Sequence, residues 1–202
     1  MEDFLRSVPR ITLFITTFSG FLSLLSTYDL IVPSDLSFNN KIYKKYQIWR
    51  LLTSFLFFGK FHFTTLIRYI IIFSTSKAME LSSSPQYLYF IILVYNYSII
   101  CSYYWGLSFA SDIFFMALVY LNSRRNRHSR IAFMGLPVSI PAPYLPFIIL
   151  AINFNPSLVF GLIFGHIYYY FEDVYPKLPR SRNVRIFNVP MLIVRLVDAL
   201  KL

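Results

Sequence analysis

Residues Gly161–Pro176 read GLIFGHIYYYFEDVYP, an apolar run that ends in two acidic residues and a proline. Its first two glycines, Gly161 and Gly165, are four positions apart, so a helix places both on one face. In a membrane helix this spacing lets a neighbouring backbone approach closely. The change to acidic residues and Pro176 is typical of a helix that leaves lipid and ends in water. The stretch therefore predicts a membrane helix that packs tightly against a neighbour.

The composition of the whole chain points to the same environment. Of its 202 residues, 56% are hydrophobic and 20% aromatic, while only 14% are charged; about a quarter of a soluble domain is charged. The 16 Tyr and 22 Phe residues suit lipid-facing surfaces and interfacial belts. The lone Cys101 excludes an internal disulfide and a cysteine-based metal site. We expect one domain with no metal and no cofactor.

The apolar stretches predict an all-α membrane protein with six transmembrane helices. The membrane domain is expected over residues 1–175, followed by a cytosolic C-terminal tail over 176–202. The expected spans are about 11–32, 61–77, 86–102, 106–122, 142–153 and 157–171. Several are short, since about fifteen to seventeen residues cover roughly 23–26 Å of a hydrocarbon core that is ~30 Å thick. Such helices favour local thinning of the bilayer or lateral packing.

The net charge of +10 is concentrated beside the apolar stretches. The densest basic run is SRRNRHSR, with Arg124, Arg125, Arg127 and Arg130. Arginine clusters next to a membrane helix mark its cytoplasmic end and suit anionic lipid headgroups. Six spans then place both termini in the cytosol, although the lysines between 41 and 45 fall on the opposite side. The sequence carries no nucleic-acid motif, so we expect no nucleic-acid partner.

Two charged residues lie within the predicted spans. Arg68 falls in the middle of the second span, and Asp112 lies near the start of the fourth. Charge at such depth is costly and usually faces the bundle interior or a water-filled cavity. One hypothesis is that Arg68 lines a hydrophilic groove that admits a substrate polypeptide, with Asp112 as a candidate partner. The alternative, that Arg68 snorkels to the surface, is left open.

Four sequence blocks together resemble the derlin family, the rhomboid-related pseudoproteases of the endoplasmic reticulum (ER). They are QIWRLLTSFLFFG (47–59), LVYLNSRRN (118–126), FMGLPVSIPAPYLP (133–146) and 161–176, and SVPRIT (7–12) resembles the opening of the family. The resemblance implies a rhomboid-like bundle of six helices in the ER membrane with both ends in the cytosol. It also implies a part in ER-associated degradation (ERAD), the quality-control route that returns misfolded proteins to the cytosol for ubiquitination and proteasomal destruction.

The resemblance assigns roles to several residues. Trp49 and Arg50 match the WR pair of the first lumenal loop, for which we expect a structural role rather than the alternative, direct contact with a substrate. Gly161 and Gly165 match the last-helix GxxxG, and Leu158 stands where active rhomboids carry the catalytic histidine. His166 lies on a different face, where we expect a buried side chain that hydrogen-bonds a neighbouring helix.

The serine half of the rhomboid dyad matches Ser111. Its flanks are Phe109 and Asp112, whereas the proteases have glycines that help to form the oxyanion site. Without a base and without those glycines, Ser111 is expected to be an inert helix hydroxyl. The chain is therefore not expected to be an enzyme.

The partners implied by the resemblance are misfolded protein clients, a membrane ubiquitin ligase complex and a cytosolic AAA ATPase. The tail ends in IVRLVDALKL, without the short glycine-containing motif through which many derlins recruit that ATPase, so direct contact is left open. Assembly into homo- or hetero-oligomers is also left open. Two rival functions are an active rhomboid-type intramembrane serine protease and a small-solute transporter. A transporter usually shows repeated halves, and none are evident here.

Overall fold

A computed structural model describes residues 8–39, 42, 46–132, 139–179 and 186–200. Two features singled out in the sequence, the lysines between 41 and 45 and residues 133–138 of the third derlin block, lie outside these ranges. The described chain is mainly helical, as predicted, and its described strands form one small hairpin. Strand β1 (Arg130–Ala132) pairs antiparallel with β2 (Ser139–Pro141).

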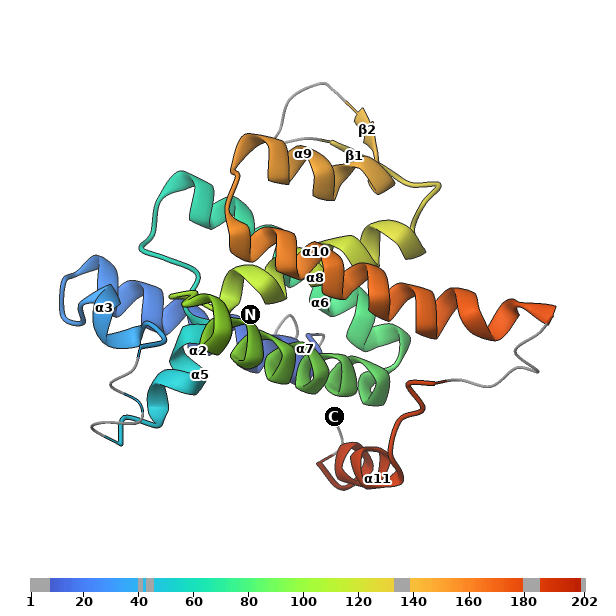
Figure 1. Ribbon diagram of the computed structural model, residues 1–202, viewed down its shortest axis with the longest axis horizontal. Coiled ribbons are helices and arrows are strands. Elements are labelled where there is room, and N and C mark those ends of the chain that lie inside the picture. Colours follow the sequence, from blue (N-terminus) through green and yellow to red (C-terminus); the bar gives the residue numbers. More distant parts are fainter. Residues whose placement is uncertain (1–7, 40–41, 43–45, 133–138, 180–185, 201–202) are drawn as a thin grey trace.

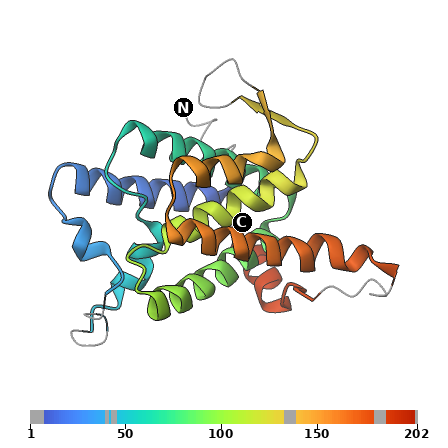
Figure 2. The same cartoon turned by 45° about the horizontal axis from the view of Figure 1, so that its top comes forward.

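Nine α-helices are described. They are α2 (Arg10–Thr27), α3 (Pro33–Leu36), α5 (Trp49–Leu56), α6 (Phe63–Ser82), α7 (Ser84–Trp105), α8 (Ser111–Arg125), α9 (Leu145–Ile152), α10 (Pro156–Tyr169) and α11 (Met191–Leu200). A 3₁₀ turn, Ala142–Tyr144, precedes α9, and a π-helix, Tyr170–Val174, continues α10 into a second 3₁₀ turn, Tyr175–Lys177. The long helices share one general direction, with α3 and α5 at one end and the hairpin and α11 toward the other (Figure 1; Figure 2).

Helix α8 forms the centre of the bundle. Every side chain from Ile113 to Leu121 is at most 1% exposed. The helix contacts α5, α6, α7, α9 and α10, with its longest interface along α10. A helix that is covered on all sides needs no polar face, which explains why this apolar stretch shows no amphipathic pattern.

Two predicted breaks in the chain have a clear local cause. Helix α7 ends at Gly106, whose φ of +64° is the left-handed conformation that glycine adopts readily. Helix α10 begins after Asn155, whose side chain accepts a hydrogen bond from the backbone N–H of Ser157. The chain thus breaks at Gly106 and before Ser157, where the expected spans are separated, although α8 begins at Ser111 and not at residue 106.

Some predicted helix bounds are wrong. The first helix ends at Thr27 rather than near residue 32, because the chain turns through Asp29, which has a φ of 54°. The second runs on past residue 77 to Ser82, since Glu80 is buried and hydrogen-bonded rather than solvated. With 20 and 22 residues, α6 and α7 reach roughly 30 Å and are not short. Helices α8 and α9 have 15 and 8 residues and are short, as predicted for several spans, whereas the 14 residues of α10 continue without a break into the π-helix Tyr170–Val174.

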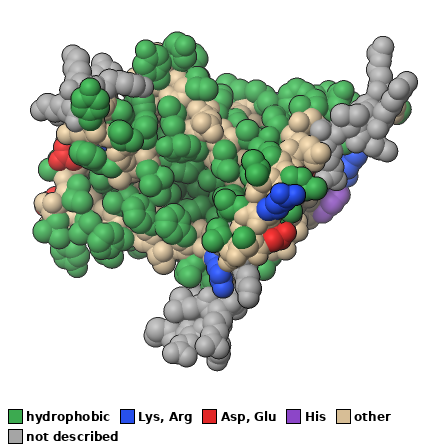
Figure 3. All heavy atoms as spheres, turned by 90° about the horizontal axis from the view of Figure 1, so that it is seen from below, with side chains coloured by type: hydrophobic (Ala, Val, Ile, Leu, Met, Phe, Trp, Pro, Cys, Tyr) green, Lys and Arg blue, Asp and Glu red, His purple; other side chains and the backbone are tan. Residues whose placement is uncertain are grey.

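Apolar side chains cover much of the outside of the bundle. Phe14 and Phe21 of α2 and Ile70 of α6 are each more than half exposed. On the face seen in Figure 3, hydrophobic side chains predominate and charged ones are few. By length and hydropathy, two of the described helices, α2 and α7, are able to cross a membrane.

Part of the predicted tail returns to the bundle. Helix α11 packs against α7 and buries Val197 to 3% exposure. The carbonyl oxygen of Leu200 accepts a hydrogen bond of 2.7 Å from the guanidinium of Arg10 at the start of α2. The sequence predicts a tail that follows the membrane domain. Residues 191–200 of that tail instead pack against α7 and the start of α2.

Candidate functional site: a polar network among three helices

A charged pair joins α6 to α8. The Nη1 atom of Arg68 lies 2.6 Å from Oδ1 of Asp112, and the two side chains are 19% and 14% exposed. The guanidinium also lies over the ring of Phe115, 5.3 Å from its centroid. The partnership considered from the sequence is therefore present. Arg68 lies in the first third of α6 and not in the middle of the helix, because α6 extends further than predicted.

A third side chain, that of Asn155, completes the network. Its amide nitrogen donates to Oδ2 of Asp112 at 2.8 Å. Its amide oxygen accepts from the backbone N–H of Ser157 and so caps α10. One asparagine thus fixes the start of α10 and connects it to α8. Sequence analysis missed Asn155, although an asparagine just before a proline that opens a helix is a recognisable cap.

The geometry gives this network a defined chemical character. It contains one cation, one carboxylate and one neutral amide, with both carboxylate oxygens of Asp112 occupied. The opposite charges of Arg68 and Asp112 neutralise each other. Both side chains are mostly buried but keep some exposed surface. Such a cluster can exchange hydrogen bonds with passing polar groups. Because both oxygens of the one carboxylate are hydrogen-bonded and its charge is paired with Arg68, the cluster is suited to binding or hydrating polar groups.

The rhomboid dyad positions hold a different arrangement. The hydroxyl of Ser111 donates to the backbone oxygen of Phe57 at 2.6 Å, and the side chain is 2% exposed. Leu158, which the resemblance matches to the catalytic histidine, is fully buried. The serine hydroxyl therefore connects α8 to the end of α5.

The two glycines of the quoted stretch lie against α8. A Cβ atom at Gly161 would meet the backbone oxygen of Ile113 at 2.5 Å and Cβ of Met116 at 2.8 Å. A Cβ atom at Gly165 would meet Cβ of Tyr120 at 3.0 Å. Both glycines are buried on the face toward α8. Their spacing allows this close approach of the two helices.

His166 makes the expected kind of contact in an unexpected place. Its Nδ1 atom and the hydroxyl of Tyr120 on α8 are 2.7 Å apart, so it does hydrogen-bond a neighbouring helix. The side chain is exposed and not buried, because the two glycines occupy the face toward α8 and His166 follows at its edge. The Nε atom of Arg124 donates to the same hydroxyl at 3.1 Å.

The WR pair divides into an exposed and a buried residue. Trp49 is 57% exposed, whereas Arg50 is 2% exposed. The guanidinium of Arg50 donates to the backbone oxygens of Ser34 and Ser37 and lies 3.3 Å from Oδ1 of Asp35. Its Nε atom donates to the side chain of Gln47 at 2.6 Å. Arg50 thus holds α3 against α5.

The basic cluster lies at the end of α8 and in the following turn. Arg125 pairs with Asp173 across 2.9 Å, and Arg124 lies over the ring of Tyr120. Arg127 is exposed and donates to the ring of His128, while Arg130 opens strand β1. Two of the four arginines thus have partners on neighbouring parts of the bundle or their own helix.

Sequence analysis also missed Glu80, a buried carboxylate at 2% exposure. Its two oxygens accept hydrogen bonds from the backbone N–H groups of Ile11 and Thr12 and from the hydroxyl of Thr12, at 2.7–2.8 Å. These N–H groups open α2 and have no partner within that helix. Glu80 therefore caps α2 from α6, a contact between positions about seventy residues apart.

Comparison with known proteins covers nearly the whole chain. The "Probable derlin-2 homolog" of Dictyostelium discoideum is 31% identical, over 98% of this chain and 83% of that protein. "Derlin-2.2" of Arabidopsis thaliana is 28% identical, over 92% and 84%. A derlin-like protein of Schizosaccharomyces pombe is 24% identical, over 86% and 96%. The model of the Der1-like family matches residues 8–191, and the chain therefore belongs to the Der1-like family, a family of membrane proteins.

Proposed function

We propose that this protein is a non-catalytic membrane factor of ERAD, which helps misfolded proteins to reach the cytosol for ubiquitination and proteasomal degradation. Membership of the Der1-like family and the similarity to derlins support this role. The observation that carries the mechanism is the network of Arg68, Asp112 and Asn155 at the junction of α6, α8 and α10.

The network lowers the cost of moving an unfolded chain through the bilayer. A peptide group that enters lipid without a hydrogen-bond partner costs several kcal/mol. The side chains of Arg68 and Asp112 are partly exposed, so water and client peptide groups reach them. We assign them to the wall of a hydrophilic groove.

Short helices contribute a second effect. At 1.5 Å per residue, α8 reaches about 22 Å and α9 only about 12 Å. The hydrocarbon core is ~30 Å thick, so the bilayer thins beside these helices. Phe147 and Ile152 of α9 are 44% and 66% exposed. Because these exposed side chains are apolar, we place α9 against the lipid where the bilayer is thinned.

The proposed topology has six membrane helices in the ER membrane: α2, α6, α7, α8, α9 and α10. Arg10, Arg125 and Lys177 then lie at the cytosolic ends, in accord with the positive-inside rule. The loop that carries Trp49 and Arg50 lies in the lumen. Both termini lie in the cytosol, where α11 rests on the end of the bundle.

The proposed partners follow from the same role. They are misfolded client proteins, a membrane ubiquitin ligase complex and a cytosolic AAA ATPase that extracts the client, directly recruited or through another subunit. Homo- or hetero-oligomers with related chains belong to the same proposal. The rival function, an active rhomboid-type protease, has less support because Leu158 replaces the base and the hydroxyl of Ser111 is engaged with Phe57.

A cycloheximide chase of a misfolded ER reporter tests the proposal, in cells that lack their own derlins. We expect wild type and Ser111→Ala to restore degradation, and Arg68→Leu to restore much less at equal protein level. Arg127→Leu is the matched control, since Arg127 is an exposed arginine outside the network. Full rescue by Arg68→Leu would refute the role of Arg68 in a hydrophilic groove. Reporter fragments that appear with the wild type and disappear with Ser111→Ala would show that the protein is a protease.

A further inference from the structure

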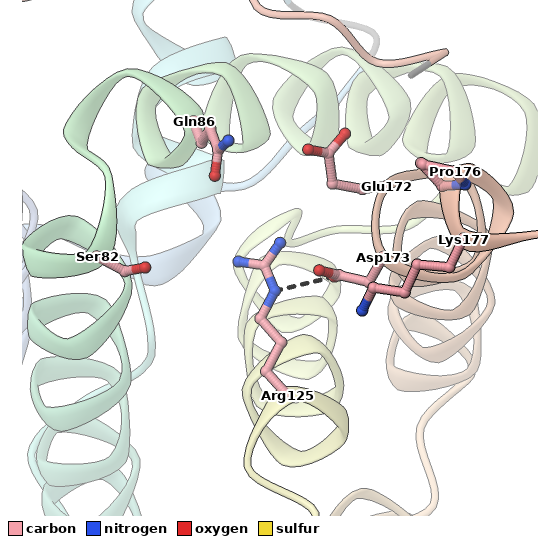
Figure 4. Close-up of a pocket in the computed structure, with 7 residues that line it drawn as sticks. All are labelled: Ser82, Gln86, Arg125, Glu172, Asp173, Pro176 and Lys177. Carbon is pink, nitrogen blue, oxygen red and sulfur yellow. Dashed lines mark hydrogen bonds and ion pairs between the residues drawn. The ribbon is translucent and has the colours of Figure 1, made fainter. Parts of the chain in front are cut away.

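A polar pocket of about 630 Å³ opens at the end of the bundle that carries the arginine cluster. Its described lining residues come from the junction of α6 and α7, from the end of α8 and from the segment after α10: Ser82, Gln86, Arg125, Glu172, Asp173, Pro176 and Lys177 (Figure 4). Segments far apart in the chain thus combine into one site, separate from the network around Arg68.

The charges in this pocket are balanced. Arg125 and Lys177 supply two cations, and Glu172 and Asp173 supply two carboxylates. Figure 4 shows Arg125 between Ser82 and Gln86 on one side and the acidic residues on the other. Its Nε atom donates to Asp173 at 2.9 Å, and both side chains are about a quarter exposed. A ligand that carries both signs of charge matches this lining better than an anion or a cation alone.

The backbone is adapted locally to present the two carboxylates. The five-residue π-helix Tyr170–Val174 interrupts the regular winding after α10. Such short π-helical turns are rare and occur frequently at functional sites. Glu172 and Asp173 are adjacent in the chain, yet both line the pocket.

Aromatic residues locate the pocket relative to the membrane. Tyr170, Phe171 and Tyr175 flank the acidic pair, with ring centroids 5.4–6.5 Å apart. Tyrosine is enriched at the level of the lipid headgroups, where its ring is in the interface and its hydroxyl in water. We therefore place the pocket, whose acidic residues lie between these aromatic residues in the chain, at headgroup depth, within reach of a lipid that stays in the bilayer.

We propose that this pocket binds the headgroup of a phospholipid with a primary amine, of the phosphoethanolamine type. The phosphate contacts Arg125 and Lys177, and the ammonium donates hydrogen bonds to Glu172 and Asp173. A trimethylammonium headgroup has no N–H donors for these carboxylates. An anionic headgroup without an amine leaves them facing a like charge. The site requires only that this end of the bundle lies at the membrane surface, so its failure would not affect the proposed role in degradation.

Native mass spectrometry of the detergent-purified protein tests this inference. Phosphatidylethanolamine, phosphatidylcholine and phosphatidylglycerol with identical acyl chains compete at equal concentration. We expect retention of phosphatidylethanolamine over phosphatidylcholine by about tenfold, the effect of ~1.4 kcal/mol of binding free energy. Asp173→Asn and Lys177→Gln should remove most of this preference. Arg124→Gln is the matched control, since Arg124 lies next to Arg125 but contacts Tyr120.

Three results would overturn the inference. One is equal retention of phosphatidylethanolamine and phosphatidylcholine by the wild type. Another is a preference for phosphatidylethanolamine that survives in both Lys177→Gln and Asp173→Asn. Lys177 is exposed, so its substitution does not threaten the fold, and thermal unfolding shows whether Asp173→Asn is still folded. The third is binding of free O-phosphoethanolamine as tight as that of the lipid, which would make the ligand a soluble zwitterion. Displacement of lipid by free O-phosphoethanolamine only in large excess supports the lipid.

Discussion

Gly161 lies so close to Ile113 that a single added methyl group would reach within 2.5 Å of the Ile113 carbonyl oxygen. A backbone oxygen in the centre of α8 cannot move aside as a flexible side chain does, so the helices must separate. We therefore expect Gly161→Ala to lower the free energy of unfolding by about 3 kcal/mol, the upper end of the usual range for overpacked cores. Thermal unfolding in detergent measures this loss.

Gly20 provides the matched control for that substitution. It also lies within a helix, α2, but a Cβ atom there would have no neighbour within 4 Å. Gly20→Ala should be neutral or slightly stabilising, since alanine favours the helix by up to about 1 kcal/mol. Equal stability of the two variants would contradict the close packing of α8 and α10.

The GxxxG pair illustrates what a sequence alone can predict. Gly161 and Gly165 share a face because of helical periodicity, and periodicity needs no knowledge of the partner. The helix breaks at Gly106 and before Ser157 could likewise be predicted from the sequence, because residues within each turn determine them. Features within one helix or one turn could therefore be predicted.

Contacts between helices were harder to predict because they depend on how each helix is rotated and which helices are neighbours. Glu80 caps α2 and Asn155 caps α10, each with a side-chain oxygen that accepts from a backbone N–H, but only the second cap is local in the chain. His166 forms the predicted bond to a neighbouring helix and yet is exposed, because its orientation about the α10 axis depends on the packing of Gly165.

The ion pair between Arg68 and Asp112 should be coupled in a double-mutant cycle. Arg68→Met and Asp112→Asn each remove one charge and leave the other shielded, so we expect each to cost about 1–3 kcal/mol of stability, less than for a fully buried pair. The double variant should lose less than the sum of the two, by at least ~0.5 kcal/mol. Strict additivity in thermal unfolding would mean that the two side chains do not interact in the membrane protein.

Removal of Glu80 should loosen the start of α2. Glu80→Ala leaves the N–H groups of Ile11 and Thr12 without an acceptor in a buried place, and hydrogen bonds to a charged group contribute about 1.5–3 kcal/mol each. We expect a loss of at least roughly 3 kcal/mol, with faster hydrogen exchange at the first turn of α2. Thr12→Val removes only the hydroxyl bond to Glu80 and should cost about 1.5 kcal/mol. Unchanged exchange in Glu80→Ala would contradict the capping role.

Ser111 should matter for stability but not for chemistry. Its hydroxyl donates to the oxygen of Phe57, a residue only 3% exposed, so Ser111→Ala leaves a buried acceptor and should cost about 1–2 kcal/mol. Ser74→Ala is the control, because that hydroxyl is exposed and bonds only within its own helix. A fluorophosphonate probe, which labels activated serines, should leave the wild type unlabelled while it labels an active rhomboid protease under the same conditions. Labelling of the wild type that is lost in Ser111→Ala would show an activated nucleophile despite Leu158, and the non-catalytic role would have to be abandoned.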